Sequence, residues 1–270
     1  MSGQDAALAR PLPARRATGG RPVANATLVG REDLTDEVAR FLVRPDDGPR
    51  PFVPGQYFSL GLSIDGGLVQ RPYSNAAAGG AAELEFLIRR VPGGRFTPAL
   101  WATPVGTPMS LGRATGLFTL LPDDDRTHLF IATGTGLAPF LAMLGGLRGR
   151  RHPPRAIVVH GVAHVAELAY RDRLTVLQAD GGVRYIPTIS RPVEARNAGW
   201  DGTTGHATQA LAGLFVDPHD RRLGRLDPGA TVAYLCGNPG MIESASAVLA
   251  SQGCPPEAIV TERYWAEAPA

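Results

Sequence analysis

A chain of 270 residues, 44% of them hydrophobic and 19% charged, has enough apolar material for about two folded domains. No apolar run reaches the ~18 residues of a membrane-spanning helix, and a net charge of +2 does not favour a nucleic-acid partner, so neither association is expected. The two cysteines, Cys236 and Cys254, form no CxxC pair and cannot by themselves make a four-thiolate site. We therefore expect no metal and a reduced, cytoplasmic setting.

The first half of the chain is predicted to be a β domain preceded by an extension. Residues 1–22 are rich in Ala, Arg, Gly and Pro without a continuous apolar core, so a disordered extension is expected rather than a secretory signal. Residues 23–121 contain short, partly alternating segments punctuated by Gly and Pro, which predict a small antiparallel β-barrel. One helix is expected here, with Thr97 as its N-cap and Pro98 as its first helical residue.

The pattern changes near 121–127. From there to residue 265, apolar strands alternate with helical segments, which predicts a doubly wound parallel sheet covered by helices on both faces. Such a sheet binds ligands beyond the carboxyl ends of its strands. The expected strands are 128–133, 156–162, 183–190 and 231–237, and the expected helices are 136–147, 167–178, 208–214 and 241–253. Residues 191–205 are expected to be a long loop.

Two glycine-rich turns are suited to phosphate. The segment "ATGTGLAP" (132–139) follows an apolar strand and opens a helix, where Gly134 and Gly136 would let the backbone approach an anion. It reads GxGxxP rather than the full dinucleotide fingerprint, so an ordinary strand–helix turn is the alternative. In "PGGRFTPAL" (92–100), Gly94 and its neighbour precede the predicted helix of the first half, and a plain hairpin turn is the alternative. Together the two turns indicate two nucleotides.

The stretch "RPYS" (71–74) helps to distinguish these interpretations. Strand alternation places Arg71 and Tyr73 on one face and Ser74 on the other, unless a bulge redirects it. An arginine can bind a pyrophosphate through two parallel hydrogen bonds. A tyrosine offers a flat face to a ring, and a serine hydroxyl can hydrogen-bond to a ring nitrogen. Alone, the stretch is equally consistent with an ordinary edge strand.

In chain order, RPYS, GGRFT before a helix, GTGLAP, HGV, CGNPGM and a terminal ERYW resemble the ferredoxin–NADP reductase family of bacterial type. The resemblance covers roughly residues 23–265. It implies an FAD-binding barrel over 23–121 and an NADP-binding α/β domain over 127–265. It also implies electron transfer between NADP(H) and ferredoxin or flavodoxin, with hydride exchange at flavin N5 and single electrons passed to the carrier.

The resemblance implies a role for each residue of the flavin side. Arg71 would hold the FAD pyrophosphate, Tyr73 would stack on the isoalloxazine, and Ser74 would approach N5. Gly94 and Thr97 would present amides and a hydroxyl to the FAD phosphates.

On the nicotinamide side, the resemblance places Thr135 and Gly136 at the pyridine nucleotide pyrophosphate, Cys236 beside the nicotinamide and Glu262 near the active site. Taken alone, Cys236 is as well explained as a small buried hydrophobe, and Glu262 as a solvated surface charge.

The aromatic pair of "ERYW" would cover the cofactor. By the resemblance, Tyr264 would lie over the flavin face opposite Tyr73, and Trp265 would lie beside the FAD adenine. The alternative is a last strand that buries its aromatic side chains in the core.

One departure from the family pattern concerns the choice between NADP and NAD. Ala163 and His206 stand where many bacterial members carry arginines that bind the 2′-phosphate, and only Ser190 and Arg191 of "TISR" keep the pattern. Each missing charged hydrogen bond is worth about 1.5–3 kcal/mol. NADP is therefore predicted, with a smaller preference over NAD than is usual in the family, and Arg196 could compensate.

Two other functions stay open. One is the NAD(P)H-dependent reductase component of an oxygenase system, or a free-flavin reductase; the cysteine count excludes a fused iron–sulfur module but not a separate carrier. The other is a non-catalytic flavin- or nucleotide-binding sensor, which should lack nicotinamide-side residues such as Cys236 and Glu262.

Overall fold

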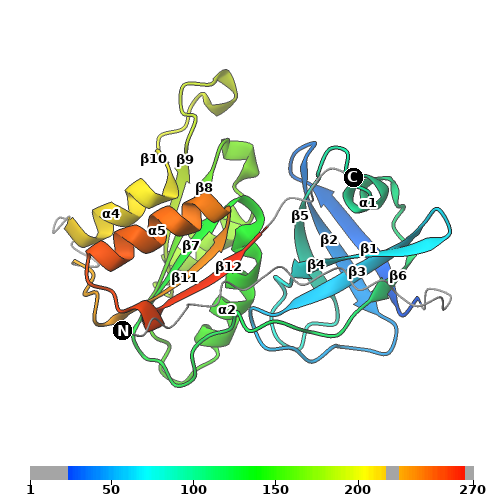
Figure 1. Cartoon of the computed structure of the whole chain (residues 1–270), viewed down its shortest axis with the longest axis horizontal. Helices are drawn as coiled ribbons and strands as arrows, with labels where there is room; N and C mark the ends of the chain where they lie inside the picture. Colours follow the sequence, from blue (N-terminus) through cyan, green and yellow to red (C-terminus); the bar gives the residue numbers. More distant parts are fainter. Residues whose placement is uncertain (1–23, 217–224, 265–270) are drawn as a thin grey trace, which may run out of the picture.

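Two sheets of opposite type stand side by side in the computed structural model, which describes residues 24–216 and 225–264 (Figure 1). The predicted extension, residues 1–22, lies outside the described residues. The first sheet is antiparallel, with the order β4-β3-β6-β1-β2-β5. Its strands are β1 (Ala26–Asp33), β2 (Val38–Pro45), β3 (Tyr57–Ile64), β4 (Gly67–Ser74), β5 (Leu84–Arg89) and β6 (Pro108–Leu111).

The two edge strands of this sheet meet, which closes the predicted barrel. Asn75, directly after β4, forms an isolated antiparallel bridge with Phe86 of β5, and the Ala76 N–H donates to the Glu85 carbonyl at 2.8 Å. The β3–β4 register runs without a bulge from Tyr57 opposite Ser74 to Ile64 opposite Gly67. Regular alternation along β4 is therefore maintained up to the serine.

The helix of this half, α1 (Phe96–Ala102), confirms the predicted element but not its predicted start. Arg95 is the N-cap and makes no side-chain capping bond. The prediction that Thr97 is the N-cap is wrong because its buried hydroxyl accepts from the Val91 N–H at 2.9 Å. The threonine thus braces the preceding turn rather than the helix terminus.

The second sheet is wholly parallel, with the order β10-β9-β8-β7-β11-β12, as predicted for the α/β half. Its strands are β7 (Thr127–Thr133), β8 (Ala156–Val162), β9 (Arg184–Ile189), β10 (Thr203–Thr204), β11 (Thr231–Gly237) and β12 (Ile259–Arg263). Four helices accompany them: α2 (Ala138–Arg148), α3 (Arg171–Ala179), α4 (Ala207–Val216) and α5 (Pro239–Ser251).

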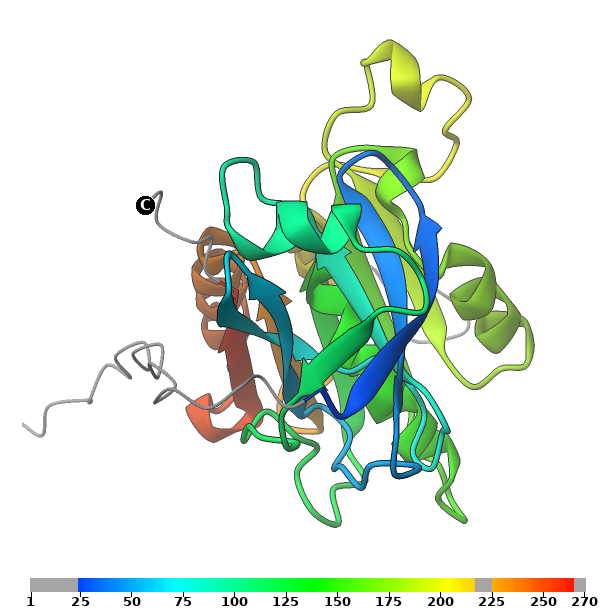
Figure 2. The same ribbon diagram turned by 90° about the vertical axis from the view of Figure 1, so that its right-hand side faces the viewer.

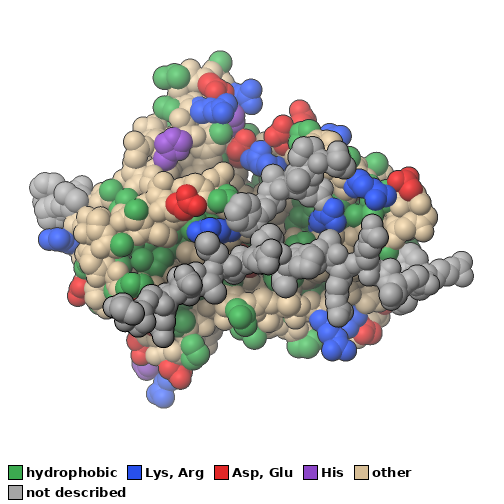
Figure 3. Space-filling view, in the orientation of Figure 1, with side chains coloured by type: hydrophobic (Ala, Val, Ile, Leu, Met, Phe, Trp, Pro, Cys, Tyr) green, Lys and Arg blue, Asp and Glu red, His purple; other side chains and the backbone are tan. Residues whose placement is uncertain are grey.

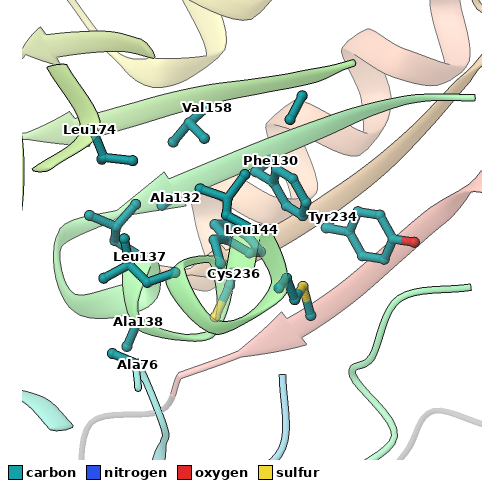
Figure 4. Close-up of a cluster of buried hydrophobic side chains, with 14 of the residues drawn as sticks. Ala76, Phe130, Ala132, Leu137, Ala138, Leu144, Val158, Leu174, Tyr234 and Cys236 are labelled. Carbon is teal, nitrogen blue, oxygen red and sulfur yellow. The ribbon is translucent and has the colours of Figure 1, made fainter. Parts of the chain in front are cut away.

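These helices cover both faces of the sheet. Side chains of α2 and α3 belong to one buried cluster, and side chains of α4 and α5 belong to another on the opposite face. The α2-side cluster, with Phe130, Tyr234 and Cys236, is shown in Figure 4. It also takes in Ala76 and Phe118 from the first half, so apolar packing continues from one half to the other.

Two details differ from the expected elements. The helix predicted from residue 167 begins at Arg171, because Tyr170 adopts a left-handed conformation with φ of 59°. The expected loop 191–205 contains a 3-10 turn, Ala195–Asn197, and the short strand β10. This segment extends beyond the rest of the molecule in Figures 1 and 2.

The surface seen in Figure 3 carries arginines and acidic side chains interspersed, without a region of a single sign. Within the described residues, no helix is long and apolar enough to span a bilayer.

Candidate nucleotide and redox site

Four side chains meet where the two sheets face each other, and we call them the junction cluster: Ser74, Cys236, Glu262 and Tyr264. The Ser74 hydroxyl donates to Glu262 Oε2 at 3.0 Å, and the Tyr264 hydroxyl donates to Ser74 Oγ at 2.9 Å. Cys236 Sγ lies 3.9 Å from the same Glu262 oxygen, as a thiol donor. Ser74 ends a strand of the barrel, whereas the other three belong to the parallel sheet, so the cluster joins the halves.

Strand pairing explains how these residues meet. Cys236 on β11 lies opposite Glu262 on β12 in the parallel register. The Tyr264 N–H then donates to the Gly237 carbonyl at 3.0 Å, which holds the tyrosine at the end of the sheet. The C-terminal "ERY" thereby reaches a serine that lies 188 to 190 positions earlier in the sequence.

Burial controls the protonation of the junction cluster. It raises the pKa of Glu262 to about 7, although hydrogen bonds from Ser74 and Cys236 act in the opposite direction. Burial, reinforced by the neighbouring Glu262 carboxylate, also raises the pKa of the Cys236 thiol well above its usual value. Burial likewise raises the pKa of Tyr264. The cluster therefore holds a neutral thiol, two neutral hydroxyls and one carboxyl that titrates near neutral pH.

A cavity of about 830 Å³ opens beside the junction cluster, at the carboxyl ends of the parallel strands. Its size suits a nucleotide-sized ligand, and its position is the one expected for a doubly wound sheet. Tyr264 contributes to its wall, which links the cavity to the cluster. Other parts of the wall come from Arg89, Thr133–Thr135, Gly161–Ala163, Glu167, Ser190, Gly205–Thr208, Gly237–Met241 and Ser244.

The glycine-rich turn is placed by a close backbone contact. A Cβ added to Gly136 would lie 2.3 Å from the Cys236 carbonyl oxygen, so only glycine lets the turn lie against β11. Gly136 is buried by this contact and is not among the residues that line the cavity, whereas Gly134 and Thr135 are. The sequence indicated a glycine for phosphate access, and the structure adds a packing role next to Cys236.

The residues predicted for the flavin side lie along the barrel. The Tyr73 ring packs against Phe96 with centroids 5.8 Å apart, and Arg71 Nη1 donates to the Gln70 carbonyl at 2.7 Å. The Gly94 N–H donates to the Val91 carbonyl at 3.1 Å, inside the turn that also binds the Thr97 hydroxyl.

Asn75 provides a test of whether a flavin fits beside Ser74. The asparagine is wholly buried; its Oδ1 accepts from the backbone N–H groups of Ala77 and Glu85, both at 3.1 Å. Its Nδ2 is buried without a hydrogen-bond partner among the described residues. A polar flavin edge next to Ser74 would supply the missing acceptor, and the donor set of this region therefore fits FAD. Trp265, predicted at the adenine, lies outside the described residues.

Arg191 lies next to the large cavity, in a neighbouring one that shares Arg89, Ala163 and Glu167 with it. It lines a second cavity of about 490 Å³ rather than the large one, which Ser190, Ala163 and His206 line. Its Nη1 is 3.3 Å from Glu194 Oε1.

Glu194 is itself surrounded by positive or donor groups. It also lies near His164 Nε2 at 2.8 Å and Arg196 Nε at 3.6 Å. The hydrogen bond to His164 is the main reason that the pKa of Glu194 is lowered, so this carboxylate stays ionised. Asn197, which is buried, donates to the Arg191 carbonyl at 2.7 Å and holds the backbone of this loop.

Ion pairs join the two halves on this side. Arg89 of β5 is 3.1 Å from both Glu37 and Glu167, and His164 is 3.2 Å from Glu167. With the pairs around Glu194 they form a continuous set, which we call the ion-pair network: Glu37, Arg89, Glu167, His164, Glu194, Arg191 and Arg196. In residues 24–216 and 225–264, no three metal-ligating side chains are grouped as a metal would need.

Known proteins resemble the chain in both halves. Residues 25–119 match the model of an oxidoreductase FAD-binding domain, and residues 130–247 match that of an oxidoreductase NAD-binding domain. A ferredoxin–NADP reductase of Pseudomonas aeruginosa is 33% identical over 215 residues, which cover 75% of this chain and 80% of that protein. The chain belongs to the ferredoxin–NADP reductase family. It is an FAD- and NAD(P)-binding oxidoreductase, as the motifs predicted.

Two further proteins, one related in sequence and one of known structure, are also similar to this chain. The reductase component of a naphthalene 1,2-dioxygenase system from Pseudomonas putida is 31% identical over 241 residues, covering 88% of this chain and 68% of that protein. A ferredoxin NADP+ reductase from Neisseria gonorrhoeae, solved with bound FAD and NADP, is 25% identical with a TM-score of 0.73. That likeness covers 88% of this chain and 97% of the other.

Sequence reasoning did not single out two polar residues of the reductase site. Asn238 caps α5: its side chain accepts from Gly240 N at 2.8 Å, and its own N–H donates to Thr133 Oγ1 at 2.9 Å. An asparagine before Pro-Gly is a recognisable helix start and could have been found. Asn75 carried no such signal, because its role depends on the barrel closing around it.

Proposed function

We propose that this reductase transfers electrons between NAD(P)H and a ferredoxin-type carrier through bound FAD. The observation that carries the proposal is the double role of Tyr264, which hydrogen-bonds to Ser74 and also lines the cavity of the parallel sheet. A flavin beside Ser74 and a nicotinamide in the cavity would then meet at the same tyrosine.

The flavin is assigned to the barrel. Arg71 would bind its pyrophosphate, Tyr73 would stack on the ring system, and the turn containing Gly94 and Thr97 would face the phosphates, with Ser74 near the flavin. These roles are supported by the suitability of a guanidinium for pyrophosphate and by the unpartnered Asn75 Nδ2 at this position. When bound, FAD supplies the chemistry that exchanges a hydride as a pair and releases electrons singly.

The dinucleotide is assigned to the cavity of about 830 Å³. Thr135 and the turn positioned by Gly136 would bind its pyrophosphate, and Ser190 would lie toward its adenosine end. Arg191 would reach the 2′-phosphate from the adjoining smaller cavity, which shares Arg89, Ala163 and Glu167 with the large one. The FAD domain corresponds to residues 23–121 and the NAD(P) domain to 127–265.

We assign two tasks to the junction cluster: it orients the reacting groups, and Glu262 binds or releases one proton. The Ser74 hydroxyl is held between Glu262 and Tyr264 and presents its Oγ toward the flavin site. Glu262, with a pKa near 7, accepts or supplies a proton through Ser74 at neutral pH. Tyr264 would cover the bound flavin and give way to the nicotinamide, and Cys236 would stay a neutral thiol beside it.

The acceptor is proposed to be a ferredoxin, with flavodoxin as an equivalent one-electron partner in the cytoplasm. The likeness to a dioxygenase reductase favours a second candidate, in which the same electrons go to the separate carrier of an oxygenase system. Both candidates share the half-reaction with NAD(P)H and differ only in the protein that takes the single electrons.

An anaerobic titration tests the shared half-reaction. The purified protein is expected to show a flavin spectrum that bleaches on addition of NADPH or NADH. The reduced protein should then reduce added ferredoxin or flavodoxin faster than free flavin. A protein without bound flavin, or a flavin that neither nucleotide bleaches, would favour the sensor function. Reduction of free flavin alone would favour a flavin reductase.

A further inference from the structure

A buried histidine lies directly behind the glycine-rich turn of the cavity. His160 on β8 is wholly buried, and its Nε2 is 3.0 Å from the Gly134 carbonyl oxygen. Its Nδ1 is 3.4 Å from the Tyr185 hydroxyl on the neighbouring strand β9. Because a carbonyl can only accept, Nε2 must carry the proton, and Nδ1 then accepts from the tyrosine O–H.

The environment keeps this arrangement in one protonation state. Burial lowers the pKa of His160 to about 4, so the ring is neutral at the pH of cellular reactions. Burial also raises the pKa of Tyr185, which therefore remains a phenol donor. In the resulting chain of hydrogen bonds, the Tyr185 hydroxyl donates to His160 Nδ1 and His160 Nε2 donates to the Gly134 carbonyl.

The geometry of the Gly134–Thr135 peptide links these hydrogen bonds to the cavity. In a trans peptide the C=O of one residue and the N–H of the next point in opposite directions. The peptide between Gly134 and Thr135 is trans, and its carbonyl points to the buried imidazole. The Thr135 N–H consequently points away from the core, and both Gly134 and Thr135 line the cavity.

We infer that His160 is a positioning residue, which holds the Gly134–Thr135 peptide so that the Thr135 N–H donates to the pyrophosphate of the dinucleotide. The inference rests on the proposed use of the cavity for NAD(P). Gly134 has φ of +52°, a left-handed conformation that glycine adopts freely, and it opens the 3-10 turn Gly134–Leu137. The hydrogen bond from His160 adds a side-chain anchor to that backbone turn and favours one orientation of the peptide.

The test is a matched pair of substitutions that differ in reach. The amide of His160→Gln can place an N–H near the Nε2 position, whereas the shorter amide of His160→Asn reaches toward Tyr185 but not toward Gly134. His160→Asn is expected to weaken binding of ADP by about 10-fold to 100-fold, the loss of a charged hydrogen bond. Binding of adenosine, which lacks phosphate, should change by less than about twofold. His160→Gln should remain within about threefold of the parent for both ligands.

The binding is measured by calorimetry on the FAD-loaded protein, with FAD content as the control for folding. In steady state, His160→Asn should raise KM for the nicotinamide nucleotide and leave kcat nearly unchanged. Equal effects of Asn and Gln, or equal losses for ADP and adenosine, would overturn the positioning role. ADP binding tests this role even if neither nucleotide reduces the flavin, an outcome that would count against the proposed function alone.

Discussion

The barrel and the parallel sheet are joined by two sets of side chains that differ in chemistry. The junction cluster is largely buried and is built from neutral donors around one carboxyl group with a raised pKa. The ion-pair network combines carboxylates and arginines with His164 and is more open at its barrel end, with Arg89 38% and Glu37 59% exposed. Solvent screens these exposed pairs more than it screens the junction cluster. The junction cluster therefore holds its side chains in one arrangement around Glu262, whereas the exposed pairs of the network are the part of the contact that responds to salt.

The largest effect is expected from Ser74→Ala. This change removes the donor to Glu262 and the acceptor for Tyr264 in one step, so the reacting groups lose their common anchor. The rate constant for flavin reduction by NAD(P)H, measured in an anaerobic stopped-flow experiment, should fall by about 100-fold. Ser63→Ala, at an exposed position of β3, is the control and should leave the rate unchanged. A normal rate in the Ser74 variant would show that the junction cluster is only structural.

Glu262→Gln should change how stability depends on pH. Since the folded pKa is about 7 and the unfolded value about 4.5, the folded state binds the extra proton between these values. The contribution of Glu262 to the free energy of unfolding is thus full below pH ~4.5 and decreases as pH rises to 7. At pH 8 the glutamine variant should be more stable than the parent by about 3 kcal/mol, relative to their difference at pH 4.5. Chemical denaturation at both pH values measures it; parallel pH profiles of the two proteins would contradict the assignment.

Glu194→Gln should shift the choice of nucleotide. Arg191 is paired with Glu194 and lines the smaller cavity, so removing the charge releases the arginine toward a 2′-phosphate. We expect kcat/KM for NADPH to rise about 5-fold to 10-fold while the value for NADH changes less than twofold. Glu257→Gln, at an exposed glutamate outside the network, serves as the control. An equal rise for both nucleotides would place the effect elsewhere than at the phosphate.

The smallest effect is expected from Arg89→Gln, although this residue links the halves through Glu167 and also pairs with Glu37 of its own half. Exposed ion pairs contribute little, and the free energy of unfolding should fall by less than about 1 kcal/mol. The difference should shrink further in 0.5–1 M salt, where the screening length is a few Å. Arg90→Gln, at the exposed neighbouring position, is the matched control. A loss as large as that from a buried pair would show that the two joining sets are not different in kind.

The sequence predicted what depends on local pattern and missed what depends on side-chain competition. Both sheets were predicted from the spacing of apolar residues. Alternating apolar residues indicate a strand buried on one face, and a continuous apolar run indicates a strand buried on both faces. The family resemblance placed Ser74, Glu262 and Tyr264 around one cofactor, and the structure adds that these side chains hydrogen-bond to one another.

The side-chain direction of Arg191 could not be predicted from local sequence pattern. A long exposed side chain can pair with several partners of similar energy, and in the structure Arg191 pairs with Glu194. The start of α1 was missed for a related reason. Thr97 has the right chemistry for a cap, but its hydroxyl finds a better partner in Val91. The contact of Gly136 with Cys236 joins residues a hundred positions apart and leaves no local signal.

The burial of Cys236 has a consequence for durability in air. Only the thiolate reacts quickly with peroxides or alkylating reagents. Cys236 is wholly buried beside Glu262, and both its burial and that carboxylate hold its pKa well above the usual value. The sulfur atom of the junction cluster is thus kept in its least reactive form. We expect this thiol to survive repeated exposure to oxygen and peroxide while the protein stays folded.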